Sequence, residues 1–309
     1  MPLTADAPAK SRPSCSAIIA TLDRLDSLRW VLDCLERQTC PPVEVIISAA
    51  GDTAPLEQEL RSRHGRLNTR LMISGVKSAA IQRNQAAAEA GGEVLAFLDD
   101  DITFDPDTFA KVLDHFMPGN LTPVGAVSPR IANTPGNTPG RLTRWYYAVQ
   151  AGYAHADFGG RLFGAGINCF PVFSANGPPR VECDWLPSTC LFIRSDVFHR
   201  HRFPRFLGYS FAEDVHLTAR VAKEAPLYFL SEPSILHHSL TSEFKSNRQL
   251  LTAGKLHNMA VVAREAMGLG GWPLWWRWQL HRLFMTVVLL VRRPAHWSDD
   301  IRGVWQAQT

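Results

Sequence analysis

A short apolar run that ends in three consecutive carboxylates constrains this chain more than any other feature. Residues 94–98 read VLAFL, and Asp99, Asp100 and Asp101 follow directly. An uninterrupted apolar run of this length is typical of a strand that is buried on both faces. Polar groups at the C-terminal end of such a strand lie where open α/β sheets bind their ligands. The stretch therefore predicts a ligand site at the end of a buried strand.

The three adjacent negative charges repel one another, so we expect a positive group to relieve them. Mg²⁺ prefers oxygen ligands and is often shared between protein carboxylates and substrate phosphates. The pattern therefore favours a divalent-metal site, although phosphoryl-transfer enzymes also carry it. As an alternative, the three carboxylates could form a solvated acidic turn or cap a helix. Just downstream, Asp105 and Pro106 predict the start of a helix, with Asp105 as N-cap and Pro106 at its first position.

Strand and helix patterns alternate before this run. Apolar, β-branched runs predict strands at residues 15–20, 43–48 and 71–73. Helical spacing predicts one helix that begins at Asp26-Ser27, and others at residues 56–63 and 77–90. This alternation predicts a mainly parallel, doubly wound sheet, in which crossovers gather the C-terminal ends of the strands at one edge. We therefore expect residues 21–24, Asp52 and residues 99–101 to meet in one crevice.

Size and composition narrow the class of protein. A chain of 309 residues, with 46% hydrophobic and 20% charged residues, has room for one large or two modest globular domains. A net charge of +3 and the lack of nucleic-acid-binding motifs argue against a nucleic-acid partner. The six cysteines form no CxxC pair and predict the reduced thiols of a cytosolic protein. Residues 1–13 lack an apolar segment and predict a disordered tail rather than a secretory signal.

Five short motifs follow one another in order along residues 15–260. They are Thr21-x-x-Arg24 with Gln38 downstream, Gln82-Arg83-Asn84, the FLDDD of residues 97–101, the DWLPST of residues 184–189, and the FAEDVHLTAR of residues 211–220. In this order and spacing they resemble the inverting glycosyltransferases of family 2, which have the GT-A fold.

The resemblance implies a fold, a domain plan and an activity. The GT-A catalytic domain would cover residues 14–240, with a nucleotide-binding half at 14–118 and an acceptor half at 119–240. The activity would be the metal-dependent, inverting transfer of a hexosyl or deoxyhexosyl group. The donor would be a UDP, dTDP or GDP sugar, and the cofactor Mg²⁺ or Mn²⁺. The acceptor would be a glycan or a lipid-linked molecule, in the synthesis of cell-surface polysaccharide or glycolipid.

The resemblance also implies roles for individual residues. The metal-binding residues would be Asp101 and Asp99, with His237 slightly favoured over His238 as a further ligand; a capped histidine at the end of a strand is the alternative. The donor-binding residues would be Thr21, Asp23, Arg24, Asp52, Arg83, Asn84, Asp99 and Asp100. The acceptor-binding residues would be Trp185, Ser188 and Thr189.

Two adjacent acids are the candidate catalytic residues. By resemblance, Asp214 would be the general base and Glu213 would orient the acceptor. Neighbouring carboxylates near a bound diphosphate would raise the pKa of at least one of them, which suits proton abstraction. The alternative is that both acids only stabilise the N-terminus of the helix that they open.

The chain departs from the usual family pattern at three places. Ser48 stands where the family often has Asp, so the nucleobase contact would depend on Asp52 alone. Ser188-Thr189 stands where glycine is frequent, so the shape of the acceptor pocket is expected to differ. Ala212 stands where glycine is common, directly before Glu213.

The C-terminal segment, residues 241–309, is predicted to be helical. Its stretch from Trp272 to Arg293 combines clustered tryptophans and arginines with a nine-residue, nearly apolar run at residues 283–291, which is too short to span a bilayer. Tryptophans and arginines on an amphipathic helix are typical of a segment that lies in the membrane surface. We therefore expect a cytoplasmic protein that is peripheral at the inner face of the cell membrane. Packing of this segment on the catalytic domain or on a dimer partner stays open.

A second class of function has to be weighed against the enzyme. A non-catalytic module that binds a sugar nucleotide or a partner could use the same fold, because fold does not fix function. The intact acidic run and the Glu213-Asp214 pair favour the enzyme. A nucleotidyltransferase is less favoured, because no glycine-rich basic signature follows the first strand.

Overall fold

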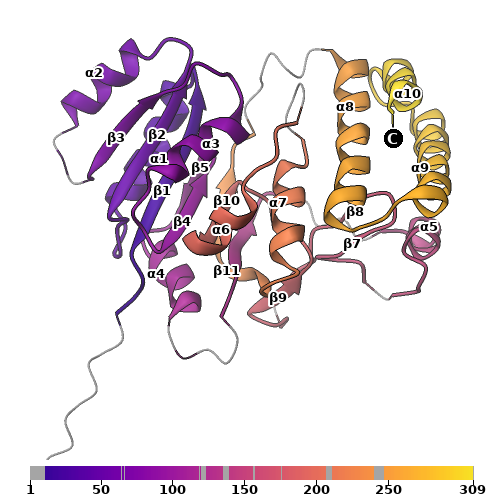
Figure 1. Ribbon diagram of the computed structural model, residues 1–309, viewed down its shortest axis with the longest axis horizontal. Coiled ribbons are helices and arrows are strands. Elements are labelled where there is room, and N and C mark those ends of the chain that lie inside the picture. The colour runs from indigo at the N-terminus through magenta and orange to yellow at the C-terminus, as the bar shows by residue number, and fades with distance from the viewer. Residues whose placement is uncertain are drawn as a thin grey trace, which may run out of the picture.

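The computed structural model describes residues 11–63, 65, 67–117, 119, 123–134, 139–155, 157–174, 176–206, 211–239 and 247–308. A central twisted sheet with helices on both faces makes up one part of the molecule, and a group of long helices packs at the other end (Figure 1). Most of the predicted N-terminal tail lies outside the described residues.

The first half of the sheet is parallel. Its strands are β1 (Cys15–Leu22), β2 (Glu44–Ala50), β3 (Thr69–Ile73) and β4 (Val94–Leu98), in the spatial order β3-β2-β1-β4. Its crossover helices are α1 (Leu25–Glu36), α2 (Ala54–Ser62) and α3 (Ala79–Ala88). Every pairing among these strands is parallel, which confirms the doubly wound sheet predicted from the alternation.

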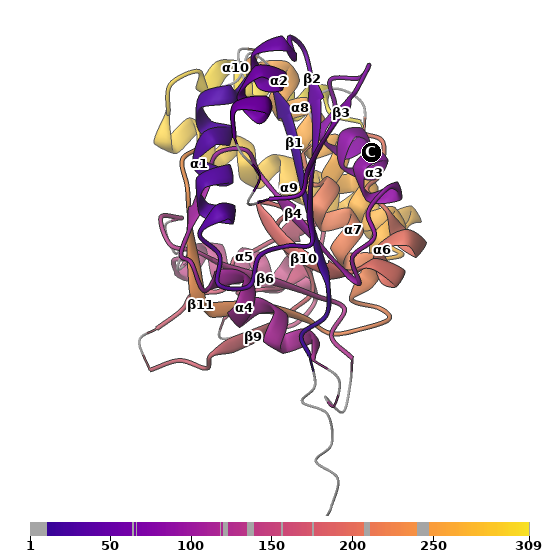
Figure 2. The same cartoon turned by 90° about the vertical axis from the view of Figure 1, so that its left-hand side faces the viewer.

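Alternation of side chains along β1 sorts the helices onto the two faces. Ala17 and Ile19 belong to one core cluster together with Leu28 of α1, whereas Ile18 belongs to a second cluster together with Ala80 of α3. Successive residues of a strand point to opposite faces, so both faces of β1 need an apolar cover. Figure 2 shows α1 and α3 on opposite sides of the strands.

The second half of the sheet is mixed. Its strands are β5 (Ile102–Phe104), β6 (Ala126–Ile131), β9 (Arg180–Cys183), β10 (Cys190–Arg194) and β11 (Leu227–His237). β10 runs antiparallel between β4 and β6, and β6 pairs with β11 in parallel. Both β5 and β9 pair with β11 antiparallel. The first residue of β10, Cys190, lies opposite the last residue of β4, Leu98, so the segment before β10 reaches the acidic run.

The remaining elements cover the second half. They are α4 (Thr108–Leu113), a 3₁₀ turn (Asp114–Phe116), α5 (Arg141–Ala151), β7 (Leu162–Phe163), β8 (Ile167–Asn168), α6 (Ser195–His201) and α7 (Glu213–Val221).

The predicted start of α4 was wrong. The helix begins at Thr108 with Asp107 as N-cap, rather than at Pro106 after Asp105. The carbonyl oxygen of Asp105 instead accepts hydrogen bonds from the Thr108 backbone, at 3.1 Å, and from the amide of Gln38, at 2.8 Å. Gln38 also accepts from the Phe109 backbone at 2.9 Å, so this motif glutamine joins the end of α1 to the start of α4.

The C-terminal helices form a core of their own. They are α8 (Arg248–Val261), a π-helical turn (Val262–Ala266), α9 (Gly271–Arg292) and α10 (Trp297–Gln306). The fully buried Trp278 of α9 packs in one cluster with Leu256 of α8 and Val304 of α10. No helix in the described part of the chain combines the length and hydropathy needed to cross a bilayer.

Candidate active site

The sheet topology places a histidine beside the acidic run. Asp99 to Asp101 form the turn between β4 and β5, and His237, the last residue of β11, lies opposite Ile102 in the β5 pairing. The backbone N–H of His238 donates to the carbonyl of Asp101 at 2.9 Å. The Nε2 atom of His237 consequently lies 3.1 Å from Oδ1 of Asp101 and 3.9 Å from Oδ2 of Asp99.

Asp99, Asp101 and His237 fit a divalent metal ion. One ligand atom from each of the three residues lies within 4.8 Å of the other two. Two carboxylate oxygens and one imidazole nitrogen are a donor set that suits Mn²⁺ and, with waters and substrate phosphate, Mg²⁺. The two neighbouring histidines point differently: Nε2 of His238 lies 3.1 Å from Oγ1 of Thr103, and its ring meets Trp30 edge-on.

Asp100 has a separate set of partners. Its Oδ2 accepts from Oγ1 of Thr21 at 2.7 Å, and its Oδ1 lies 3.2 Å from the guanidinium of Arg24. Arg24 also lies 3.5 Å from Asp101. Burial raises the pKa of Asp100 to about 6, although the Thr21 hydroxyl and Arg24 oppose the rise. The middle carboxylate, Asp100, is therefore buried and bonded to the TxxR motif. It is not part of a solvated acidic turn.

Arg83 links the acidic run to the start of α7. It lies on α3 and is only 4% exposed. Its guanidinium bonds to Asp99, donates to Oγ of Ser188 at 3.1 Å, and lies 3.4 Å from Oε1 of Glu213. One buried cation thus connects its own motif to three others, so that four of the five sequence motifs meet at Arg83.

Asp23 and Asp52 meet at the C-terminal edge of β1 and β2, as predicted. The backbone N–H of Asp52 donates to Oδ1 of Asp23 at 2.7 Å. Gly51 makes this approach possible, because it has φ +86° and a Cβ there would lie 2.2 Å from the same carboxylate oxygen. Both carboxylates are exposed, so they are available to a ligand.

Asn84 points its amide at the backbone instead. Its Nδ2 donates to the Phe203 carbonyl at 2.9 Å, and its Oδ1 accepts from the Phe203 N–H at 3.0 Å. This pair anchors the segment that follows α6, a contact that the sequence motif did not reveal. The predicted donor-binding role of Asn84 stays a prediction.

Glu213 and Asp214 differ in exposure and in partners. Glu213 is buried, and its Oε2 has no hydrogen-bond partner among the described residues. Burial raises the pKa of Glu213 to about 8, against the attraction of Arg83. Asp214 is half-buried, and its two oxygens accept from the backbone N–H of Val215 at 2.8 Å and of Ser188 at 3.2 Å. Burial also raises the pKa of Asp214, and these two backbone donors oppose the rise.

The residue before this pair has an unusual backbone. Ala212 has φ +67°, in the left-handed region where a side chain is strained. Glycine has no such strain, which gives a physical reason why glycine is common at this position in the family. The preceding loop, residues 207–210, lies outside the described residues.

The predicted acceptor segment lies against α7. Thr189 accepts from the backbone N–H of Asp99 at 3.0 Å, and Leu186 donates to Oγ1 of Thr218 at 3.0 Å. Trp185 is 2% exposed and donates to the Cys169 carbonyl at 3.2 Å. The structure thus shows Trp185 packed in the core, and the acceptor-binding roles of Trp185, Ser188 and Thr189 stay predictions.

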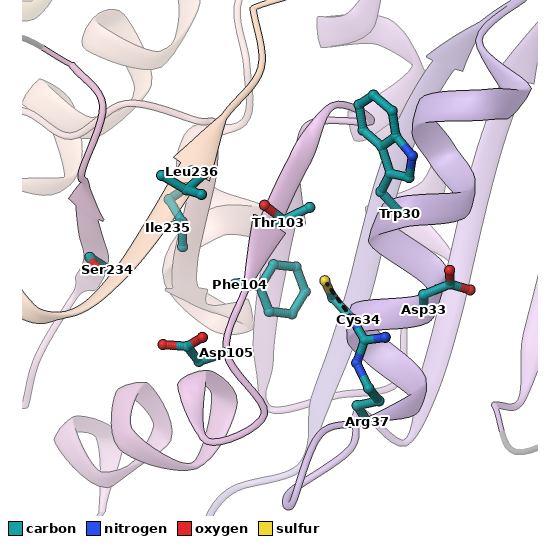
Figure 3. Close-up of a pocket in the computed structure, with 10 residues that line it drawn as sticks. All are labelled: Trp30, Asp33, Cys34, Arg37, Thr103, Phe104, Asp105, Ser234, Ile235 and Leu236. Atoms are coloured by element: carbon teal, nitrogen blue, oxygen red, sulfur yellow. Dashed lines mark hydrogen bonds between the residues drawn. The ribbon is translucent and has the colours of Figure 1, made fainter.

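A cavity of about 460 Å³ lies elsewhere, between α1, β5 and β11 (Figure 3). Trp30 and Cys34 of α1 face Phe104 of β5 across it. Its lining contains none of the metal-binding candidates and neither of the two acids of α7. The cavity is therefore separate from the candidate active site.

Known proteins share this fold. S. aureus TarS 1-349 in complex with UDP-GlcNAc is similar with a TM-score of 0.56 and 15% identity, over 90% of this chain and 73% of that chain. The mannosyltransferase PcManGT from Pyrobaculum calidifontis, in complex with GDP-Man and Mn²⁺, is similar with a TM-score of 0.54 and 16% identity, over 96% of this chain and 85% of that chain. No curated protein matches the chain significantly.

The sequence itself matches a family. The profile described as Glycosyl transferase family 2 matches residues 16–171, just over half of the chain. The matched stretch contains the TxxR motif, Arg83 and the acidic run, which the structure brings together at the ends of β1 and β4. With this match and with solved glycosyltransferases as structural neighbours, the chain belongs to glycosyl transferase family 2 and has the GT-A fold.

Proposed function

We propose that this protein is a metal-dependent, inverting glycosyltransferase that takes its sugar from a nucleoside-diphosphate donor. The observation that carries the proposal is the linked set of charged groups at the ends of β1, β4 and β11. Asp99, Asp101 and His237 form one side of it, and Arg83 connects them to Glu213 and thereby to Asp214. Family membership and the sugar nucleotides bound by TarS and PcManGT support the same conclusion.

Asp99, Asp101 and His237 would hold Mg²⁺ or Mn²⁺. When bound, such an ion supplies Lewis-acid stabilisation for the negative charge that develops on a leaving diphosphate. Thr21 and Arg24 keep Asp100 and Asp101 in place through the contacts described above. Asp23 and Asp52, exposed at the neighbouring strand ends, would contact the nucleoside of the donor.

Asp214 is our proposed general base. It would take the proton of the acceptor hydroxyl while the hydroxyl oxygen forms its bond to the anomeric carbon. The bond from that carbon to the diphosphate oxygen breaks at the same time on the opposite face, so the configuration inverts. Asp214 is the more exposed of the two acids, and two backbone N–H groups hold its carboxylate. Glu213 is buried against Arg83 and would orient the acceptor side of the site.

The acceptor is proposed to be a glycan or a lipid-linked molecule, used in cell-surface polysaccharide or glycolipid synthesis. The proposed plan keeps residues 14–240 as the catalytic domain and residues 241–309 as a helical, membrane-associating extension. We place the protein in the cytoplasm at the inner face of the cell membrane. A non-catalytic module that binds a sugar nucleotide is the competing function, and turnover distinguishes the two.

The test uses the purified full-length protein and a panel of UDP, dTDP and GDP sugars with Mn²⁺ or Mg²⁺. We expect one donor to be hydrolysed or transferred, and Asp101→Asn to abolish this activity while leaving the fold intact. The matched control is Asp26→Asn, because the Asp26 side chain is 93% exposed on α1. Donor binding without turnover would favour the non-catalytic module. Full activity of Asp101→Asn, or of the wild type in excess chelator, would contradict the metal role.

A further inference from the structure

The outward side of α9 carries exposed apolar side chains towards both ends of the helix, with the polar Gln279 between Trp275 and Leu283. Trp272 is 70% exposed at its start and Val291 is 78% exposed at its end. The other exposed apolar side chains of α9 are Trp275, Leu283, Val287 and Leu290. Apart from the neighbours Leu290 and Val291, successive members are three, four or eight residues apart, which places them on one face of a helix that is 22 residues and about 33 Å long.

The opposite side of α9 already provides its packing. Leu274, Trp278, His281 and Leu289 are buried. Trp278 and Leu289 share a cluster with α8 and α10. A surface helix normally carries polar residues on the side that faces away from its core. Packing within the described fold therefore does not explain the outward apolar side chains of α9.

Helix α5 packs on α9 and carries exposed apolar side chains of its own. The ring of Tyr146 stacks on Phe284 of α9 with 3.7 Å between ring centroids, and its hydroxyl bonds to His281. Both helices lie at the end of the molecule farthest from β3 (Figure 1). Leu142 and Trp145 of α5 are 72% and 64% exposed. We call the exposed apolar side chains of these two helices the α5–α9 face.

The charged residues of the two helices themselves have one sign, and Glu265 and Asp299 are the acids nearest to α9 along the chain. Residues 266–298 contain four arginines and no aspartate or glutamate, and α5 contains Arg141 and Arg144 and no acid. Some of these arginines lie against tryptophan rings, with Arg277 Cζ 5.5 Å from the centroid of Trp276 and Arg293 Cζ 5.8 Å from that of Trp297. Tryptophan with arginine is the side-chain combination that membrane–water interfaces favour.

We propose that the α5–α9 face docks on an anionic lipid bilayer, with α9 lying in the plane of the membrane surface. The apolar stripe would enter the headgroup region, and the arginines would meet the anionic headgroups. A second copy of the chain fits less well, because a two-fold interface would place these acid-free, arginine-bearing helices against themselves.

The test is flotation of the full-length protein with vesicles of phosphatidylcholine alone and of phosphatidylcholine mixed with phosphatidylglycerol. We expect binding to the mixed vesicles, with an affinity that falls as salt is added. The double variant Trp272→Gln/Trp275→Gln and the double variant Arg141→Gln/Arg144→Gln should each weaken binding by about tenfold or more. Only the tryptophan variant should keep the salt dependence of the wild type.

The matched control is Val43→Gln/Ile73→Gln, which removes two apolar side chains, Val43 directly before β2 and Ile73 at the end of β3, that are 52% and 68% exposed. Strands β2 and β3 lie at the opposite end of the molecule (Figure 1). This control should bind as the wild type does, and circular dichroism should show all variants folded. Equal binding to both vesicle types, unchanged binding of the tryptophan variant, or absence of lipid binding with a dimer in sedimentation would each overturn the proposal. This proposal rests on the membrane-associating role proposed for residues 241–309. Flotation measures no transfer activity, so a failure to bind vesicles would leave the proposed glycosyl transfer untouched.

Discussion

Replacement of Arg83 by methionine is the perturbation whose size the structure lets us work out most fully. The substitution keeps an unbranched side chain on α3 and removes the cation that bonds to Asp99, Ser188 and Glu213. Glu213, with a pKa raised by burial to about 8, is mostly protonated at pH 7 and loses little when the cation is removed. The loss is therefore that of one charged hydrogen bond to Asp99, about 1.5–3 kcal/mol, and one to Ser188, about 0.5–1.5 kcal/mol.

We accordingly expect Arg83→Met to lower the free energy of unfolding by about 2–4.5 kcal/mol at pH 7. The loss should grow above pH 8. A carboxyl group whose pKa is raised in the folded protein makes its full contribution to stability below its unfolded pKa, and that contribution falls as the pH rises through the folded pKa. Without Arg83 the folded pKa of Glu213 lies higher still, so the decline continues to higher pH in the variant than in the wild type.

The assay is urea unfolding of both proteins at pH 7 and pH 9 in the presence of a chelator, so that metal binding does not contribute. The control is Arg83→Met combined with Glu213→Gln, which removes the titrating group. In the double variant, the loss of unfolding free energy should no longer be larger at pH 9 than at pH 7. A loss below about 1 kcal/mol at pH 7 would refute the hydrogen-bond reasoning. A difference that does not grow by pH 9 would refute the reasoning on Glu213.

Three further changes test other parts of the site. Asp214→Asn should lower kcat by roughly 10²–10⁴-fold with little change in calorimetric donor affinity, the usual effect of losing a general base; a collapse of kcat only in Glu213→Gln would move the base by one residue. Ala212→Gly should raise the free energy of unfolding by about 0.5–1 kcal/mol, because relief of about 1–2 kcal/mol of strain exceeds the loss of one buried methyl group, and a lower melting temperature would contradict this. Gly51→Ala should lower the free energy of unfolding by at least about 1 kcal/mol, because the new Cβ would displace Asp23. Unchanged unfolding and unchanged donor affinity in this variant would contradict the crowding at this turn.

The parallel half of the fold could be predicted from local patterns because each of its strands is a separate apolar run and helices follow β1, β2 and β3. The antiparallel insertion of β10 between β4 and β6 could not, because pairing between distant segments leaves no periodic signal. The long strand β11 leaves only a weak local signal, because Glu232 and Pro233 interrupt its apolar pattern.

The candidate site shows the same division. The gathering of Asp52 and the acidic run at the strand ends follows from topology alone, and the carboxyl ends of β1, β2 and β4 lie along one edge. The use of Asn84 to anchor Phe203, and the burial of Trp185, depend on tertiary contacts more than 15 residues apart in sequence. His237 lies beside Asp101 because the register of β11 with β5 sets it opposite Ile102, whereas His238 follows the strand and contacts Thr103 and Trp30.

The stereochemistry of the product tests inverting transfer most directly. The donor identified in the panel would be incubated with the full-length protein, Mn²⁺ and a glycan or lipid-linked acceptor, and the anomeric configuration of the new linkage read by NMR. A single displacement with Asp214 as base predicts a β-linked product from an α-linked donor. An α-linked product from that donor would contradict the mechanism proposed for this site.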